Sequence, residues 1–252
     1  MRVEHLYRYP VKGLSAEALE TADVEEGSAI PWDRAFALAH GDSLFDPQAP
    51  AFRPKTDFMC LMKNARIASL RSAYDPRADR LTIATPDGRI VEAQPRTEAG
   101  RARITAFLVE FLGEEARGAP SFHYVPGHVF HDQRKAVISL LNLASVHALE
   151  AAAGAKRDRM RFRANIYFTA DAAFREFEWV GRMVQIGGAT LQVARRTVRC
   201  PATQVNPATA ERDADPPAEL RAAFGHSDLG VHAVVVEAGR IALGDAIVPL
   251  DD

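Results

Sequence analysis

Short stretches of alternating or continuous apolar residues recur along most of the 252-residue chain, and this pattern predicts strands. The clearest case is residues 81–85, which are followed by Pro86-Asp87-Gly88 and a second apolar stretch at 89–91. Because Asp-Gly tolerates positive φ, we predict a hairpin here. Further strands are predicted at residues 2–9, 34–39, 163–169, 183–186, 189–195, 231–237 and 246–250, with turns at Gly187-Gly188 and Gly239.

Two segments have the spacing of helices with one apolar face. The first is carried by Ile104, Phe107, Leu108, Phe111 and Leu112, which recur every three or four positions. Gly113 is placed to end this helix. A second helix is predicted through residues 140–151, with Ser139 as its N-cap, Gly154 at its end and His147 as a core histidine on its inner face.

Proline and glycine divide the chain into two parts. Residues 49–54 are too rich in proline for a regular element and are predicted to form a loop. Residues 118–129 contain two prolines and two glycines and are predicted to connect an N-terminal to a C-terminal lobe. The fold class predicted is mainly β with some helices (α+β), because short strands separated by glycine turns are typical of a β-barrel.

Composition and charge narrow the possible partners. The chain is 47% hydrophobic and 25% charged, as is usual for a globular protein. Its net charge of −2 provides no global field to attract nucleic acid or an anionic membrane, so we expect neither as a partner. The first residues lack the pattern of a signal peptide, and no stretch approaches the roughly 18 apolar residues of a membrane span. We therefore expect a cytoplasmic protein.

The two cysteines differ in their sequence surroundings. They lie too far apart for a CxxC metal motif, and a reduced compartment is expected. Cys60 lies in an apolar run and is predicted to be buried packing. Cys200 lies among four arginines: Arg195, Arg196, Arg199 and Arg212. Because guanidinium groups lower the pKa of a nearby thiol, Cys200 is a candidate reactive sulfur, with a packing role at a strand end as the alternative.

Cys200 also begins a run with a characteristic spacing: Arg199-Cys200, then Val205 to Thr209, then Arg212-Asp213. This run resembles the signature of the MOSC family, which is named after the C-terminal domain of molybdenum cofactor sulfurases. Other segments resemble the family in the same order, namely Tyr9 to Leu14, Asp33 to Leu38, Arg161 to Ile166 and Gly239 to Asp245. The resemblance covers essentially the whole chain.

The resemblance implies two domains and a cofactor. Residues 1–118 would form an N-terminal MOSC-associated β-rich domain and residues 119–252 the MOSC β-barrel domain. A molybdenum cofactor (molybdenum-molybdopterin) would bind between them, with Cys200 as metal ligand and catalytic residue. A soft thiolate suits a metal that is already held by dithiolene sulfurs. The other cofactor-binding residues implied by the resemblance are Lys12, Arg34, Arg163, Asn165, Thr197 and Arg199.

The longer members of the family imply an activity. They include bacterial and mitochondrial reductases of N-hydroxylated compounds, so the resemblance implies an oxidoreductase that removes oxygen from a small-molecule substrate such as an amidoxime. Two electrons and two protons would be needed for each water released. Because two cysteines cannot hold a four-cysteine iron–sulfur cluster, we expect a separate electron-donor protein.

Several positions depart from the family pattern. Asn206 stands in place of an aspartate, Ala210 in place of a glycine, and Gly13 where mitochondrial members often have serine. Asp132 is only a weak site candidate, because the large Arg134 and Lys135 follow it where smaller residues are usual.

Two other functions stay open. The chain could carry sulfur, as a persulfide on Cys200, or carry the cofactor itself without redox turnover. Alternatively, a barrel rich in arginine could bind some other anionic small molecule.

Overall fold

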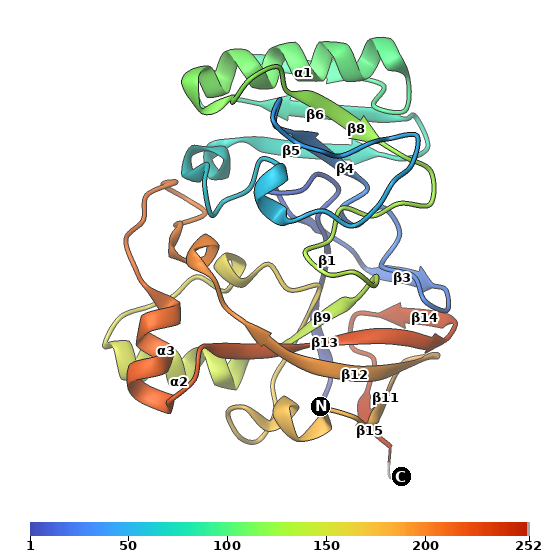
Figure 1. Cartoon of the computed structure of the whole chain (residues 1–252). Coiled ribbons are helices and arrows are strands. Elements are labelled where there is room, and N and C mark those ends of the chain that lie inside the picture. Colours follow the sequence, from blue (N-terminus) through green and yellow to red (C-terminus); the bar gives the residue numbers. More distant parts are fainter. Residues whose placement is uncertain (251–252) are drawn as a thin grey trace.

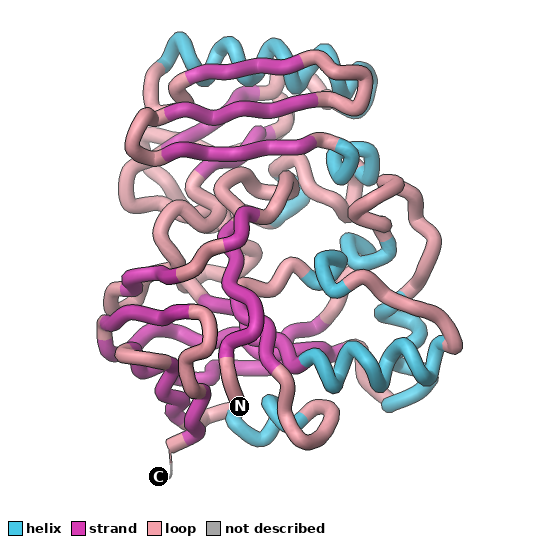
Figure 2. The backbone as a smooth tube through the Cα atoms, turned by 180° about the vertical axis from the view of Figure 1, so that it is seen from behind, coloured by secondary structure: helices cyan, strands magenta, loops and turns pink. Residues whose placement is uncertain are grey.

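Two lobes lie one above the other in the computed structural model, which describes residues 1–250 (Figure 1). The upper lobe holds a three-stranded sheet, a strand pair and a helix. Its elements are β5 (Arg71–Asp75), β6 (Arg80–Ala84) and β7 (Ile90–Ala93), the pair β4 (Phe36–Ala39) and β8 (Ser121–Tyr124), and α1 (Glu98–Leu112). Figure 2 shows from behind how the three-stranded sheet lies across this lobe with the helix along it.

The lower lobe is built on an eight-stranded sheet. In spatial order its strands are β15 (Ile247–Pro249), β11 (Met183–Ile186), β12 (Ala189–Val198), β13 (Asp228–Glu237), β9 (Ile138–Asn142), β10 (Ile166–Phe168), β1 (Val3–Arg8) and β2 (Glu17–Ala18). Beside it lie the pair β3 (Thr21–Val24) and β14 (Gly239–Ala242) and the helices α2 (Leu143–Ala153) and α3 (Pro216–Phe224). Short 3₁₀ helices are η1 (Lys55–Asp57), η2 (Ala65–Ser69), η3 (Gly113–Glu115), η4 (Arg159–Phe162), η5 (Arg175–Trp179) and η6 (Pro201–Gln204).

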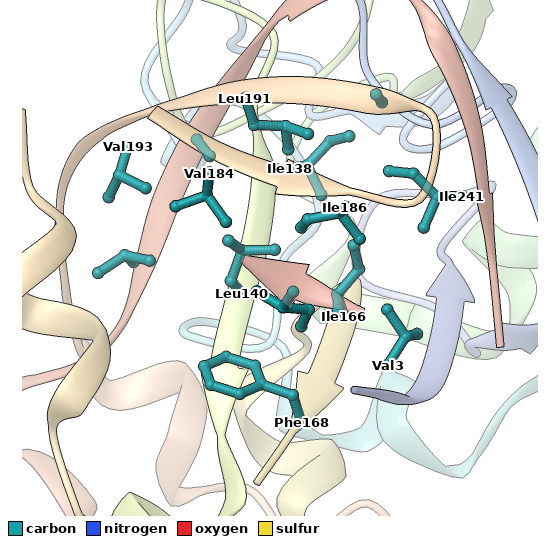
Figure 3. Packing of buried hydrophobic residues seen from close by; sticks show 14 of the residues in the cluster. Val3, Ile138, Leu140, Ile166, Phe168, Val184, Ile186, Leu191, Val193 and Ile241 are labelled. Carbon is teal, nitrogen blue, oxygen red and sulfur yellow. The ribbon is translucent and has the colours of Figure 1, made fainter. Parts of the chain in front are cut away.

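The predicted fold class, mainly β with some helices, is confirmed. Strand β11 alternates exposed and buried residues, and it pairs antiparallel with β12 through the predicted turn at Gly187-Gly188. The inward side chains of β11 and β12 pack into one core with those of β9, β10 and β1, which belong to the same sheet (Figure 3). Burial of these apolar side chains is what holds the curled sheet together.

The upper lobe also follows its sequence pattern. The predicted hairpin is formed by β6 and β7, and Gly88 has a φ of +87° in the turn. Helix α1 buries Ile104, Leu108 and Phe111 on one face, and it ends at Gly113 as predicted. Thr97 caps its start by accepting a hydrogen bond from the Gly100 amide at 3.0 Å.

Three local predictions are wrong, each because a distant partner decides the structure. Residues 121–124 of the predicted connector form β8, which pairs with β4 some eighty positions earlier in the chain. Ser139 lies in β9 rather than at a helix cap, because β9 pairs with both β13 and β10. The helix that follows begins at Leu143 with Asn142 as its cap, and His147 is exposed rather than a core histidine.

Each lobe contains segments from both predicted parts of the sequence. Strand β1 belongs to the lower sheet although it opens the chain, and β3 pairs with β14 near the other end of the sequence. Conversely, β8 follows residue 118 and lies in the upper lobe. The division at residues 118/119 therefore stays a prediction about the sequence, while in space both lobes draw on both parts. Among residues 1–250, no helix is long and apolar enough to cross a membrane.

Asn142 is expected to matter more to stability than an ordinary helix cap. Its side chain is fully buried, accepts from the amides of Ala144 and Ala170, and donates to the carbonyl of Ala172 at 2.8 Å. We expect Asn142→Ala to lower the free energy of unfolding by about 2–4 kcal/mol, since it leaves buried backbone groups unpaired.

Denaturant unfolding would measure this, with Thr97→Ala as the matched control. That variant removes an exposed cap and should cost only about 1 kcal/mol. Equal losses in the two variants would contradict the assignment of a buried hydrogen-bonding role to Asn142.

Candidate functional site

One cavity of about 410 Å³ is lined by every residue that the family resemblance implied as a cofactor or metal ligand. It lies where segments of both lobes meet. The selected residues on its wall are Lys12, Arg34, Arg163, Asn165, Thr197, Arg199 and Cys200. Their roles as ligands remain predictions, but their gathering from four separate segments of the chain is a feature of the fold.

Cys200 is positioned by the end of β12. Register shifts interrupt the pairing of β12 with β13 twice just before this end, and such bulges redirect the residues that follow. Cys200 then caps η6, and its carbonyl accepts from the amide and hydroxyl of Thr203 at 3.0 and 2.9 Å. Its side chain is half-buried and free of any disulfide.

Arg212 fastens the segment after Cys200 to the other lobe. Its guanidinium donates to the Pro201 carbonyl at 2.8 Å and to the carbonyls of Leu61 and Met62 at 2.9 and 2.8 Å. Cys60, which directly precedes Leu61, is buried as predicted and also lines the cavity. The two cysteines, far apart in sequence, thus belong to the same site.

The loop after Cys200 keeps its conformation despite its departures from the family pattern. Asn206 accepts from the Ala208 amide at 2.9 Å and donates to the Asp213 carboxylate at 2.7 Å. An aspartate could form only the first of these hydrogen bonds. Ala210 has a φ of +61°, a conformation that favours the glycine of the family pattern.

Arg34 and Arg163 stack on the ring of Tyr9. Their guanidinium carbons lie 4.4 and 4.3 Å from its centroid, which is close enough for cation–π attraction. Both arginines have left-handed backbones, with φ of +49° and +50°. Arg34 donates to the Arg163 carbonyl at 3.1 Å, and Arg163 donates to the Leu14 carbonyl at 2.7 Å. The two cations are therefore held in fixed places by a neutral ring, by carbonyls and, for Arg34, by the carboxylate of Asp33.

Arg199 is also buried, and only carbonyl oxygens accept its hydrogen bonds. It donates to the carbonyls of Phe162, at 2.9 Å, and Leu229. Gly230 makes room for it, because a Cβ there would lie 3.1 Å from Arg199 Nη2 and only 2.6 Å from the Leu140 carbonyl. Burial lowers the pKa of both Arg163 and Arg199 to about 10.

Several polar atoms on the cavity wall are buried without a hydrogen-bond partner. They are Arg161 Nε, Arg163 Nη2, Thr197 Oγ1, Arg199 Nε and His232 Nδ1. Within residues 1–250, neither Arg163 nor Arg199 forms an ion pair with a carboxylate. Because unpaired buried donors and cations are costly, this wall is suited to an anion that accepts hydrogen bonds.

Lys12 and Asn165 are more fully engaged within the protein. The Lys12 ammonium donates to the Phe130 carbonyl at 2.8 Å and to Asp132, which leaves one N–H. Asn165 accepts from the amide and hydroxyl of Ser139 and donates to the Tyr7 carbonyl at 3.2 Å. Asn165 therefore ties β10 to β9 and β1, and it too retains one N–H.

The buried carboxylate of Asp33 positions Arg34 and His131, two residues that line the cavity. It accepts from the Tyr9 amide at 2.7 Å, from Arg34, and from His131 Nε2 at 3.2 Å. Since His131 Nδ1 accepts from the Val137 amide, the proton is assigned to Nε2. Burial alone would raise the pKa of Asp33, but Arg34 and His131 outweigh it and lower that pKa to about 2.

Sequence reasoning missed several residues on this wall. Lys55, in η1 of the upper lobe, lies beside Cys200 with its Nζ 3.9 Å from Asp132. Burial alone would lower its pKa, but Cys200 and Asp132 together raise it. His232, in β13, is kept neutral because burial and the positive Arg199 and Arg195 lower its pKa to about 3. No local motif marks either residue. Lys55 reaches the site because the two lobes pack together, and His232 reaches it because β13 pairs with β12 and β9.

The site offers a metal little beyond one thiol. Among residues 1–250, no three His, Cys, Asp or Glu side chains are grouped as metal ligands. A metal at Cys200 would therefore need its remaining ligands from a bound organic group. An anionic group with its own sulfur ligands fits both the single thiol and the unpaired cations.

Comparison with known proteins gives two family matches and weak structural likenesses. The model of the MOSC N-terminal beta barrel domain matches residues 1–119, and that of the MOSC domain matches residues 127–248. The YuaD protein from Bacillus subtilis is 15% identical, with a TM-score of 0.46 over 100% of this chain and 96% of its own. YiiM from Geobacillus stearothermophilus is 19% identical, with a TM-score of 0.35 over 45% of this chain and 54% of its own, about half its length. No curated protein matches the chain.

The stack on Tyr9 predicts how anion binding responds to mutation. Tyr9→Leu removes the ring on which both guanidiniums stack, whereas Tyr9→Phe keeps the ring and loses only the hydrogen bond from the hydroxyl to the Ala164 carbonyl. We expect phosphate to raise the melting temperature of the native protein and of Tyr9→Phe, but to have little effect on Tyr9→Leu. Thermal unfolding with and without phosphate measures this, and equal shifts in both variants would contradict it.

The low pKa of Asp33 predicts an acid-sensitive contribution to stability. A carboxyl with a depressed pKa stabilises the fold above its unfolded value of 3.8, and this contribution is lost as the pH falls towards 2. We expect Asp33→Asn to lower the free energy of unfolding by about 2 kcal/mol near neutral pH and to flatten its decline between about pH 4 and pH 2.

Urea unfolding at a series of pH values tests this. The control is Asp171→Asn, whose side chain is 82% exposed and which should leave the profile unchanged. An unchanged slope in Asp33→Asn would show that the buried carboxylate does not govern acid stability.

Proposed function

The chain belongs to the MOSC family, in the form with an N-terminal domain, and we propose that it binds a molybdenum cofactor in the cavity between its lobes. The family is associated with binding of that cofactor. For this chain, the observation that carries the proposal is the set of buried cations without carboxylate partners around a single half-buried thiol.

The donor set fits the chemistry of such a cofactor. Molybdopterin ends in a phosphate, and charge-assisted hydrogen bonds from guanidinium groups suit phosphate oxygens. Arg163, Arg199 and Arg34 would supply these bonds, with the unpaired hydroxyl of Thr197 and the last N–H of Lys12 and Asn165 completing the wall. The fixed places of Arg34 and Arg163 mean that little side-chain entropy is lost on binding.

Cys200 would hold the metal through its thiolate. The ammonium of Lys55 lies beside it and would offset the negative charge of a metal-bound thiolate. When bound, the cofactor would supply two-electron chemistry that cleaves an N–O bond. Cys200 is therefore the residue on which both metal binding and turnover are proposed to depend.

The proposed reaction is reduction of an N-hydroxylated substrate to the corresponding N–H compound and water. An amidoxime or hydroxylamine would take up two electrons and two protons for each water released. Lys55, Asp132 and His131, which line the same cavity as Cys200, would orient the substrate and exclude bulk water. The electrons would come from a separate donor protein, since the two cysteines of this chain cannot hold an iron–sulfur cluster.

The first test is the metal content of protein produced in a host that makes the cofactor. We expect about one molybdenum and at least one phosphorus per native chain, with amidoxime reductase activity when a reducing system is supplied. Cys200→Ala should lose the activity and most of the molybdenum. Without cofactor, its melting temperature should stay close to that of cofactor-free native protein, because the thiol is only half-buried.

Cys60→Ala is the matched control, because Cys60 lines the same cavity but is not the proposed metal ligand. It should retain molybdenum and activity. Molybdenum absent from the native protein would overturn the proposal. Full activity of Cys200→Ala would overturn the proposed role of Cys200. A mass gain of one sulfur atom on Cys200 after incubation with a cysteine desulfurase, in a protein without reductase activity, would favour sulfur carriage instead.

A further inference from the structure

A second cavity of about 310 Å³ adjoins the first. One side is formed by residues 50–53 of the upper lobe, and the other by residues 127–136, which lead from β8 to β9. Phe130, His131 and Gln133 line both cavities. The two spaces are therefore neighbours, separated only by the segment that also carries Asp132.

The inner wall of this second cavity is aromatic. Phe58 and Phe130 are almost fully buried and pack against each other with ring centroids 5.3 Å apart, and His128 lies 4.9 Å from Phe130. Phe52 adds a half-buried ring on the opposite side. Such a wall favours a flat apolar group, because aromatic rings pack well on one another and release water when they do.

The mouth of the cavity carries a cation without an anionic partner. Arg53 is paired with Asp57 at 2.7 Å. Arg134 instead lies over the Phe52 ring, 5.2 Å from its centroid, and within residues 1–250 no carboxylate forms an ion pair with it. Its planar guanidinium is exposed and can grip a carboxylate through two parallel hydrogen bonds.

The outer wall is held by side chains rather than by backbone hydrogen bonds. In the described chain, no backbone–backbone hydrogen bond involves residues 46–53. The contacts that keep this wall in place are the Phe52–Arg134 stack and the Arg53–Asp57 pair. A ligand that slides between Phe52 and Phe130 would thus displace side-chain contacts without disrupting any regular element.

From these three features we propose that the second cavity binds a planar aromatic carboxylate, with the ring on the Phe52, Phe58 and Phe130 wall and the carboxylate on Arg134. Because the second cavity lies beside the first, it would serve as a substrate-binding site. It would hold the ring and carboxylate of an aromatic N-hydroxylated acid while the N–O group of that acid lies near Cys200. This second step rests on the proposed function, whereas the binding of an aromatic acid does not.

The binding itself is tested with benzoate and protein that lacks any cofactor. A ligand this small should bind native protein with a dissociation constant of roughly millimolar order. Arg134→Gln should weaken binding about tenfold, because it removes a charge-assisted bidentate contact. Phe52→Leu should weaken it several-fold, and benzamide and cyclohexanecarboxylate, which lack the charge or the flat ring, should bind less well than benzoate.

Lys135→Gln is the matched control. It removes the same charge at the next position, but Lys135 lines neither cavity, so benzoate binding should be unchanged. Titration followed by ligand-observed NMR would give all of these constants. Binding that is unaffected by Arg134→Gln but lost in Arg163→Gln would place benzoate in the first cavity and overturn the proposal.

A kinetic comparison separates this proposal from the proposed function. With cofactor-loaded enzyme, Arg134→Gln should raise KM for 4-carboxybenzamidoxime about tenfold and leave kcat and the KM for benzamidoxime unchanged. Equal effects on both substrates would overturn the substrate role of the cavity. A native protein without molybdenum or reductase activity that still binds benzoate through Arg134 would overturn the proposed function and support the second site.

Discussion

The stacking of the Arg34 and Arg163 guanidiniums on the ring of Tyr9 is the interaction on which the arrangement of the site depends. Arg34 follows the turn that enters the upper lobe, whereas Arg163 lies between η4 and β10 of the lower lobe. Two like charges would normally repel one another out of such a position. A π face attracts both, and the buried carboxylate of Asp33 compensates Arg34. The stack therefore fixes the lobes relative to each other at the point where the cavity opens.

That arrangement leaves positive charge inside the protein, and this charge affects the stability of the fold. Arg163 and Arg199 hold only carbonyl oxygens, and burial lowers the pKa of each to about 10. Burying an unpaired charge is unfavourable, so in the absence of a ligand these two arginines lower the free energy of unfolding relative to apolar residues at the same positions. An anion that accepts their remaining N–H groups recovers this cost on binding. By linkage, a ligand that binds only the folded chain raises the free energy of unfolding, and the increase grows with its binding affinity.

The sequence predicted those parts of the molecule whose structure is set locally. Alternation in β11 and β12, the Asp-Gly hairpin and the stripe of α1 each depend on residues within a dozen positions, and all three are confirmed. Ser139 illustrates the opposite case. Its local surroundings favour a helix cap, but pairing of β9 with β13 and β10 buries the segment as a strand. Strand β8 was missed for the same reason, since only β4 makes a strand of it.

The candidate site divides in the same way. Resemblance to a family supplied residues that lie near Cys200 in space although they are scattered in sequence, and all of them line one cavity. Lys55 and His232 carry no such mark, because each reaches the cavity only through a packing that brings η1 and β13 to it. Asn206 shows why a departure from a pattern must be interpreted in its structure. Its amide pairs with Asp213, the carboxylate that also accepts from Arg161 on the cavity wall, so an aspartate there would place two negative charges together. At this position the departure strengthens the loop that follows the proposed metal ligand.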